Sequence, residues 1–160
     1  MLFRSFKYNA PPFELVVPVA SQRAAAVLTS LVDLMLVDQG LSSDGQLSTH
    51  AAFALQTSVG DRMAIQLPAG AQVLSVSVNG SEAAVETAGD RRIVRLPSSA
   101  GQVIRVLVEV TYAQADASSG SLPSARLADA AGNPVPVQQV LWRVALPEDI
   151  INFLANRIRT

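Results

Sequence analysis

The stretch that decides the fold runs from Val103 to Tyr112 and reads Val-Ile-Arg-Val-Leu-Val-Glu-Val-Thr-Tyr. From Ile104 onward an apolar side chain occupies every second position. The positions between them are polar, with Leu107 as the exception. Because successive side chains of a strand point to opposite faces, this pattern predicts a strand with one face in the core. We expect this strand at the centre of a sheet.

A second alternating stretch, residues 73–78, runs directly into Asn79-Gly80. Both residues tolerate the positive φ of a type I′ turn, so the pair strongly indicates a hairpin. Alternation places Leu74, Val76 and Val78 on one face and Ser75 and Ser77 on the other, and a return strand is expected through residues 83–85.

Alternation recurs in further segments of the chain. They are residues 47–56, 63–67, 93–96 and 139–146. Trp142, the only tryptophan, lies in the last of these and is predicted to be a core anchor. Many short strands separated by turn residues are typical of an all-β protein, and the fold class predicted is an antiparallel β-sandwich.

Two segments are less clearly patterned. Residues 22–38 combine an alanine run with β-branched residues and lack a clean helical period; we interpret them as a long strand, with a buried helix as the alternative. Residues 148–160 place Ile150, Leu154 and Ile158 on one stripe and are predicted to form a short C-terminal helix. The predicted domain is therefore residues 1–147, with 1–20 as edge or docking strands, followed by that helix.

The charge balance argues against a nucleic-acid partner. The chain of 160 residues has 12 Lys and Arg against 13 Asp and Glu, and only 16% of it is charged. Phosphate binding needs clustered cations, and the densest basic spot is Arg91-Arg92 with Arg95. Alternation puts Arg91 and Arg95 on one strand face, which is interpreted as solvated. The longest apolar run, residues 24–37, is too short and too interrupted to span a bilayer, so no transmembrane segment is predicted.

Few residues could carry chemistry. His50 is the only histidine, and the chain has no cysteine, which rules out a multi-histidine or thiolate metal site. Asp38 and Asp44 flank a short loop that could help to hold calcium, but ordinary turn chemistry is the favoured interpretation. No nucleophile elbow, P-loop or dinucleotide fingerprint occurs. The sequence predicts no cofactor, no metal, no catalytic residue and no enzyme.

Aromatic residues gather at the N-terminus. Phe3, Phe6 and Tyr8 surround Arg4 and Lys7, a spacing that suits a sticky edge strand. We interpret the three aromatic residues as a docking edge for a neighbouring domain or another copy of the chain. The alternative is that they close the sandwich.

Several short sequence segments occur along the chain in a fixed order. They are Gln66-Leu67-Pro68-Ala69-Gly70-Ala71, Val76-Ser77-Val78-Asn79-Gly80, Arg95-Leu96-Pro97, residues 106–112, Ser119-Gly120-Ser121-Leu122 and Val140-Leu141-Trp142-Arg143-Val144-Ala145-Leu146-Pro147. Their order resembles tandem β-sandwich regions of large uncharacterised bacterial proteins of planctomycete type, often associated with the cell envelope. The resemblance covers residues 45–150 and implies a non-catalytic module of a longer chain, placed outside the cytoplasm.

These observations lead to one functional interpretation. The chain is expected to be a non-catalytic structural or interaction module of a larger envelope-associated protein, which docks to neighbouring domains, a protein partner or a second copy of itself. The alternative is a sandwich that binds a glycan or another ligand.

Overall fold

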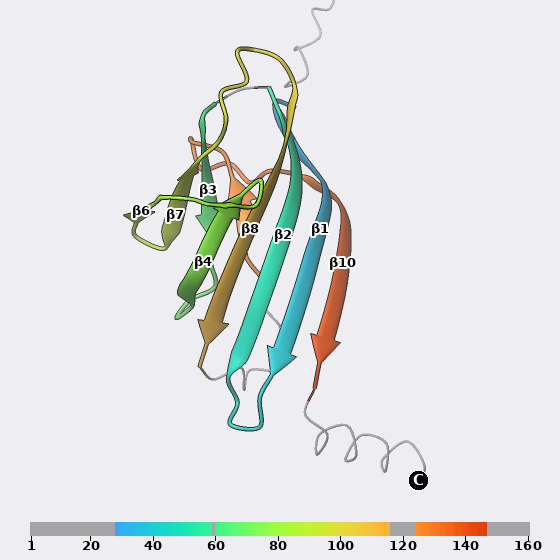
Figure 1. The fold of residues 1–160 in the computed structure, drawn as a ribbon, viewed down its shortest axis with the longest axis vertical. Coiled ribbons are helices and arrows are strands. Elements are labelled where there is room, and N and C mark those ends of the chain that lie inside the picture. Colours follow the sequence, from blue (N-terminus) through green and yellow to red (C-terminus); the bar gives the residue numbers. More distant parts are fainter. Residues whose placement is uncertain (1–27, 59, 116–123, 147–160) are drawn as a thin grey trace, which may run out of the picture.

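The computed structural model describes residues 28–58, 60–115 and 124–146. These residues contain ten strands in two sheets and no helix, as Figure 1 shows. The large sheet has the order β10 (Val137–Ala145), β1 (Ser30–Leu41), β2 (Leu47–Thr57), β8 (Ile104–Gln114), β4 (Gln72–Val78) and β5 (Ser81–Glu82). The small sheet has the order β6 (Val85–Ala88), β7 (Arg91–Arg95), β3 (Arg62–Gln66) and β9 (Arg126–Ala128). The all-β prediction is confirmed for these residues.

One hydrophobic core lies between the two sheets. The large sheet contributes Val37, Phe53 and Val108, and the small sheet contributes Ile65 and Val94, all of them fully buried. Each such side chain stabilises the fold by about 1.5–3 kcal/mol relative to exposure. The two layers are therefore held together by side chains that alternate inward along strands of both sheets.

The strand predicted from residues 103–112 is β8, and it lies inside the large sheet between β2 and β4. Val106, Val108 and Val110 are buried, as is Tyr112, while Leu107 is 40% exposed. Both the alternation and the central position are confirmed.

The Asn79-Gly80 hairpin is also confirmed. Asn79 and Gly80 have φ values of 53° and 76°, and the flanking residues of β4 and β5 are paired. Asn79 does more than turn the chain, because its Oδ1 accepts a hydrogen bond of 2.9 Å from the Leu107 backbone N–H. Its own N–H donates to the Leu107 carbonyl at 2.8 Å. The turn is thereby joined to the central strand.

Register irregularities shift the inward positions of two strands. In β4 the register changes between Val73 and Ser75, so Leu74 is the extra residue and is 62% exposed. The prediction that Leu74 shares a face with Val76 is therefore wrong, because a bulge interrupts the side-chain alternation at this point. In β1 the register changes between Val32 and Leu34, on either side of Asp33, and Met35 then takes up the buried face.

The last strand corrects two predictions. β10 pairs with β1 in parallel, so the fold is not purely antiparallel. Trp142 is 40% exposed and is not a core anchor. Its register partner Val37 is fully buried on the same face, so the difference comes from position: β10 is the edge strand, on the side of the large sheet away from β6 and β7 (Figure 1).

The ambiguous segment at residues 22–38 is a strand from residue 30 onward, and residues 22–27 lie outside the described part. The predicted C-terminal helix at 148–160 also lies outside it, so that helix and the domain boundary at 147 stay predictions.

Candidate functional site

Of the described residues singled out from the sequence, the structure brings together Asp38 on β1 and His50 on β2, which are register partners. Phe3, Phe6 and Tyr8, the predicted docking edge, lie outside the described residues. His50 is on the outward face of β2, and its Nε2 lies 3.5 Å from Glu109 Oε1. The Glu109 carboxylate also accepts a hydrogen bond of 2.9 Å from Ser77 Oγ. Within the described residues no group of three or more His, Cys, Asp or Glu side chains could hold a metal ion.

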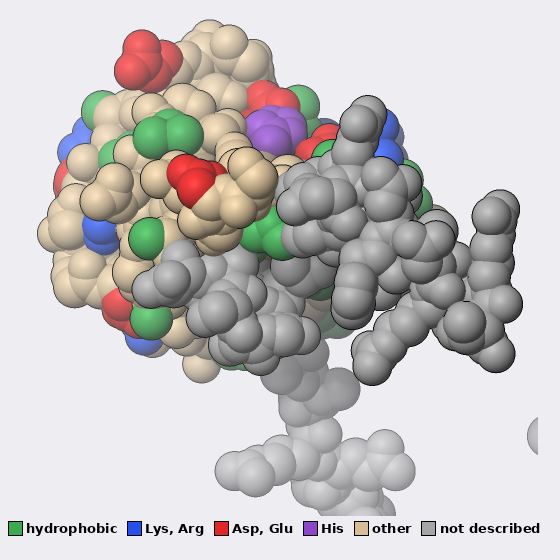
Figure 2. All heavy atoms as spheres, turned by 90° about the horizontal axis from the view of Figure 1, so that it is seen from below, with side chains coloured by type: hydrophobic (Ala, Val, Ile, Leu, Met, Phe, Trp, Pro, Cys, Tyr) green, Lys and Arg blue, Asp and Glu red, His purple; other side chains and the backbone are tan. Residues whose placement is uncertain are grey.

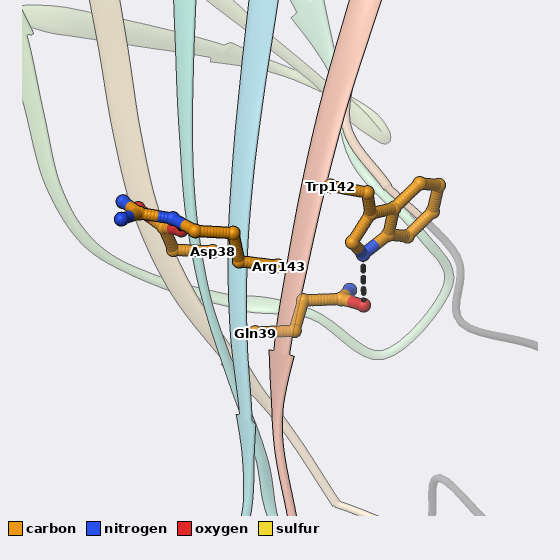
Figure 3. Close-up of polar contacts among 4 residues, drawn as sticks. All are labelled: Asp38, Gln39, Trp142 and Arg143. Carbon is orange, nitrogen blue, oxygen red and sulfur yellow. Dashed lines mark hydrogen bonds and ion pairs between the residues drawn. The ribbon is translucent and has the colours of Figure 1, made fainter.

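Asp38 and Asp44, which the sequence suggested as flanking a loop, lie in β1 and in the β1–β2 turn and make different contacts. Asp38 accepts two hydrogen bonds from the Arg143 guanidinium, one of them 2.6 Å from Nη2 to Oδ2, and this bond lowers the pKa of the carboxyl below its usual value. Figure 3 shows Arg143 reaching from β10 to Asp38 on β1. Asp44 accepts a hydrogen bond from the Ser42 hydroxyl, which lowers the pKa of Asp44. Turn and strand-pairing chemistry accounts for both residues.

A line of polar side chains crosses the core face of the large sheet. Trp142 Nε1 donates to Gln39 Oε1 at 2.9 Å, as Figure 3 shows, and Gln39 Nε2 donates to Thr49 Oγ1 at 3.1 Å. Thr49 in turn hydrogen bonds to the phenol of Tyr112, which also accepts a bond of 3.1 Å from the Ala125 backbone N–H. We call Trp142, Gln39, Thr49 and Tyr112 the polar chain.

The polar chain is buried at its centre. Gln39, Thr49 and Tyr112 are 3%, 0% and 0% exposed, so each polar atom must find a partner inside the protein. Burial raises the pKa of Tyr112, and the hydrogen bonds from Thr49 and Ala125 act in the opposite direction. The polar chain connects β10, β1, β2 and β8 with one another and with Ala125, which precedes β9. The sequence carried a signal for it, since Thr49 is the only polar residue among the inward positions of residues 47–55.

A cleft of about 380 Å³ opens on the small sheet. We call it the outer cleft, and its lining consists of Arg62, Met63, Ala64, Ala88, Asp90, Arg91, Ile93, Asp129 and Ala130. Ala64 on β3 is the register partner of Ile93 on β7, and these two side chains form an apolar floor. Turns that follow β6 and β9 supply the remaining wall.

Arg91 has an unusual setting at the outer cleft. A Cβ on Gly132 would lie 2.6 Å from Arg91 Nη1, so the guanidinium lies against this turn and a side chain at position 132 would make it shift. Gly132 has a φ of 91°, which also favours glycine. Within the described part of the chain the Arg91 guanidinium makes no hydrogen bond or ion pair.

The other charges of the outer cleft are largely engaged. Glu86 accepts from Arg62 at 3.3 Å and lies 3.8 Å from Arg95. Asp129 accepts hydrogen bonds of 2.8 and 2.9 Å from the backbone and side chain of Asn133, which lower the pKa of Asp129. The prediction that Arg91 and Arg95 share a face is confirmed by the pairing of β7 with β3. The outer cleft beside Arg91 was not predicted, because the turn after β9 that walls it comes from a distant part of the sequence.

The face of the molecule seen in Figure 2 carries no continuous basic or acidic patch: acidic, basic and apolar side chains of the described residues are interspersed. Among the described residues, no helix has the length and apolar character needed to cross a membrane.

No protein-family model matches the sequence, and no curated protein sequence matches it. Solved structures do share the fold. A two-domain M1 zinc metallopeptidase bound to L-arginine has a TM-score of 0.53 at 14% identity, covering 76% of this chain and 33% of that one. The M1 zinc metallopeptidase of Deinococcus radiodurans has a TM-score of 0.52 at 16% identity, covering 74% and 33%. Leukotriene A4 hydrolase from Saccharomyces cerevisiae has a TM-score of 0.51 at 12% identity, covering 74% and 24%.

This likeness corrects the functional interpretation drawn from sequence. The fold neighbours include M1 zinc metallopeptidases, which contradicts the interpretation as an envelope-associated structural or interaction module and its alternative, a sandwich that binds a glycan or another envelope component. At these identities the likeness concerns the fold alone, and the chain spans a third or less of the length of these neighbours. The resemblance to planctomycete-type proteins stays a prediction.

Proposed function

We propose that this chain is a peptidase-related β-sandwich domain, which works with a zinc-bearing catalytic unit rather than hydrolysing peptides itself. The observation that carries the proposal is the match to one third of a two-domain M1 zinc metallopeptidase. A fold that accounts for a third of a two-domain enzyme is the size of one domain, and the described strands here would be the counterpart of that domain.

The ligand chemistry of zinc supports the assignment of catalysis to a unit other than this domain. Catalytic zinc is held by three protein ligands drawn mainly from His, Glu and Cys, and the whole chain has one histidine and no cysteine. His50, the one histidine, contacts Glu109 on an outward strand face. The catalytic ligands are therefore assigned to another domain or polypeptide.

Two assays test the proposal together. The purified chain is mixed with aminoacyl p-nitroanilides, with and without added zinc, and release of p-nitroaniline is followed. In parallel, the tagged chain is isolated under native conditions from its source cells, and the isolated material is assayed with and without 1,10-phenanthroline. We expect no turnover by the chain alone and chelator-sensitive aminopeptidase activity in the native isolate, restored by zinc. The tag alone, carried through the same isolation, is the control.

The two assays can fail separately. Zinc-dependent turnover by the purified chain would overturn the assignment of catalysis to another unit. A native isolate with no more chelator-sensitive activity than the tag control would overturn the link to a peptidase.

A further inference from the structure

We propose that the outer cleft is a carboxylate-binding site in which Arg91 receives the C-terminal carboxylate of a short peptide. The choice of a peptide as the ligand rests on the proposed function. The anion site itself rests only on the geometry of the cleft.

Arg91 supplies the hydrogen-bond donors of the proposed site. A guanidinium offers planar, paired N–H donors that match the two oxygens of a carboxylate. In the described part of the chain no acidic group takes up these donors, and the guanidinium lies in the wall of the cleft against the turn at Gly132. Its donors are therefore open to an anion that enters the cleft.

The charges around Arg91 determine which anion fits the outer cleft. Arg62, the other cation in the cleft, already forms an ion pair with Glu86. Asp90 and Asp129 line the same cleft. A dianion such as phosphate would meet one available cation and two carboxylates, so a group with a single negative charge is favoured.

The apolar lining of the outer cleft determines which group can accompany the carboxylate. The floor next to Arg91 is made by Ala64, Ile93 and Ala88, whose small or aliphatic side chains accept an apolar group. A volume of about 380 Å³ lies at the lower end of the range for small-ligand sites. A short peptide acid with small side chains combines the required charge with the required size.

The test is a titration of the isotope-labelled chain followed by ¹H–¹⁵N NMR. The probes are acetyl-Ala-Ala as the free acid, the same peptide as its C-terminal amide, and inorganic phosphate. We expect the acid to shift the amide signals of Ala64, Ile93 and Gly132, and the amide peptide and phosphate to bind more weakly by roughly tenfold or more, which is the loss expected for one charge-assisted bond.

Three variants identify the residues responsible. Arg91→Gln should weaken binding of the acid roughly tenfold or more while leaving the melting temperature unchanged. Gly132→Ala keeps the charge but displaces the guanidinium, so it should weaken binding as well. Arg105→Gln, on the large sheet, is the matched control and should bind like the unaltered chain.

Several results would overturn the proposal: equal binding of acid and amide, no binding of the acid, or unaltered binding by Arg91→Gln. Phosphate binding as tight as that of the acid would overturn the peptide assignment, because the site would then take any oxyanion. None of these results depends on peptidase activity in the native isolate, so this inference and the proposed function can fail independently.

Discussion

Thr49 shows what a single residue contributes to this core. It is fully buried, it accepts a hydrogen bond from Gln39, and it hydrogen bonds to the Tyr112 phenol. Its hydroxyl therefore stands in the middle of the polar chain, between two other buried polar side chains. If one member of such a network is removed, its neighbours stay buried with an unsatisfied hydrogen-bonding group, and the full desolvation penalty of that group destabilises the fold.

Thr49→Val is expected to lower the free energy of unfolding by about 1–3 kcal/mol, although the two side chains have similar shapes. Thr111→Val is the matched control, because Thr111 is the register partner of His50 on the opposite face, and it should change stability by no more than roughly 0.5 kcal/mol. Urea unfolding followed by circular dichroism measures both. Equal effects of the two substitutions would show that the hydroxyl of Thr49 does not stabilise the core.

At the scale of the element, regular alternation and its interruptions decide which side chains are buried. β8 alternates without interruption, so its buried face could be read directly from the sequence. β4 and β1 each contain a register shift, and beyond it the parity of the buried positions changes. Nothing in the local sequence marks Leu74 or Asp33 as the extra residue, because the position of a bulge depends on the curvature and strand pairing of the whole sheet.

The alternation of β8 predicts opposite outcomes for aspartate substitutions at two adjacent positions. Val108→Asp puts a lone carboxylate into the core, at a cost of several kcal/mol against a total stability of about 5–15 kcal/mol, and should prevent folding. Leu107→Asp places the same charge on the exposed face and should leave a cooperative thermal transition, which differential scanning calorimetry detects. A cooperative transition for the Val108 variant would contradict the assignment of this face to the core.

For the whole molecule, the unequal size of the two sheets matters most. The large sheet has six strands and the small sheet four, so the layers do not cover each other completely. β10 lies at one end of the large sheet, and Val140, Leu141, Trp142 and Val144 are exposed there. Trp142 is nevertheless tied to the core through its bond to Gln39.

Trp142→Ala should therefore cost about 1–2 kcal/mol, for one hydrogen bond and partial burial. Phe53→Ala, at a fully buried position, should cost about 3–5 kcal/mol and serves as the reference. As the only tryptophan, Trp142 should also be quenched readily by acrylamide. A cost equal to that of Phe53→Ala, together with protection from the quencher, would mean that Trp142 is buried in the folded chain.

Local pattern alone determined the all-β class, the central strand β8, the Asn79-Gly80 hairpin and the inward face of β2, because period-two alternation and positive-φ turns are properties of neighbouring residues. The tertiary structure decided the parallel pairing of β10, the exposure of Trp142, the bulges, the polar chain and the outer cleft. Each of these depends on which distant strands become neighbours. Arg91 and Gly132 lie 41 positions apart in the sequence, and only the pairing of β7 and β9 with the two sides of β3 brings the guanidinium against that turn.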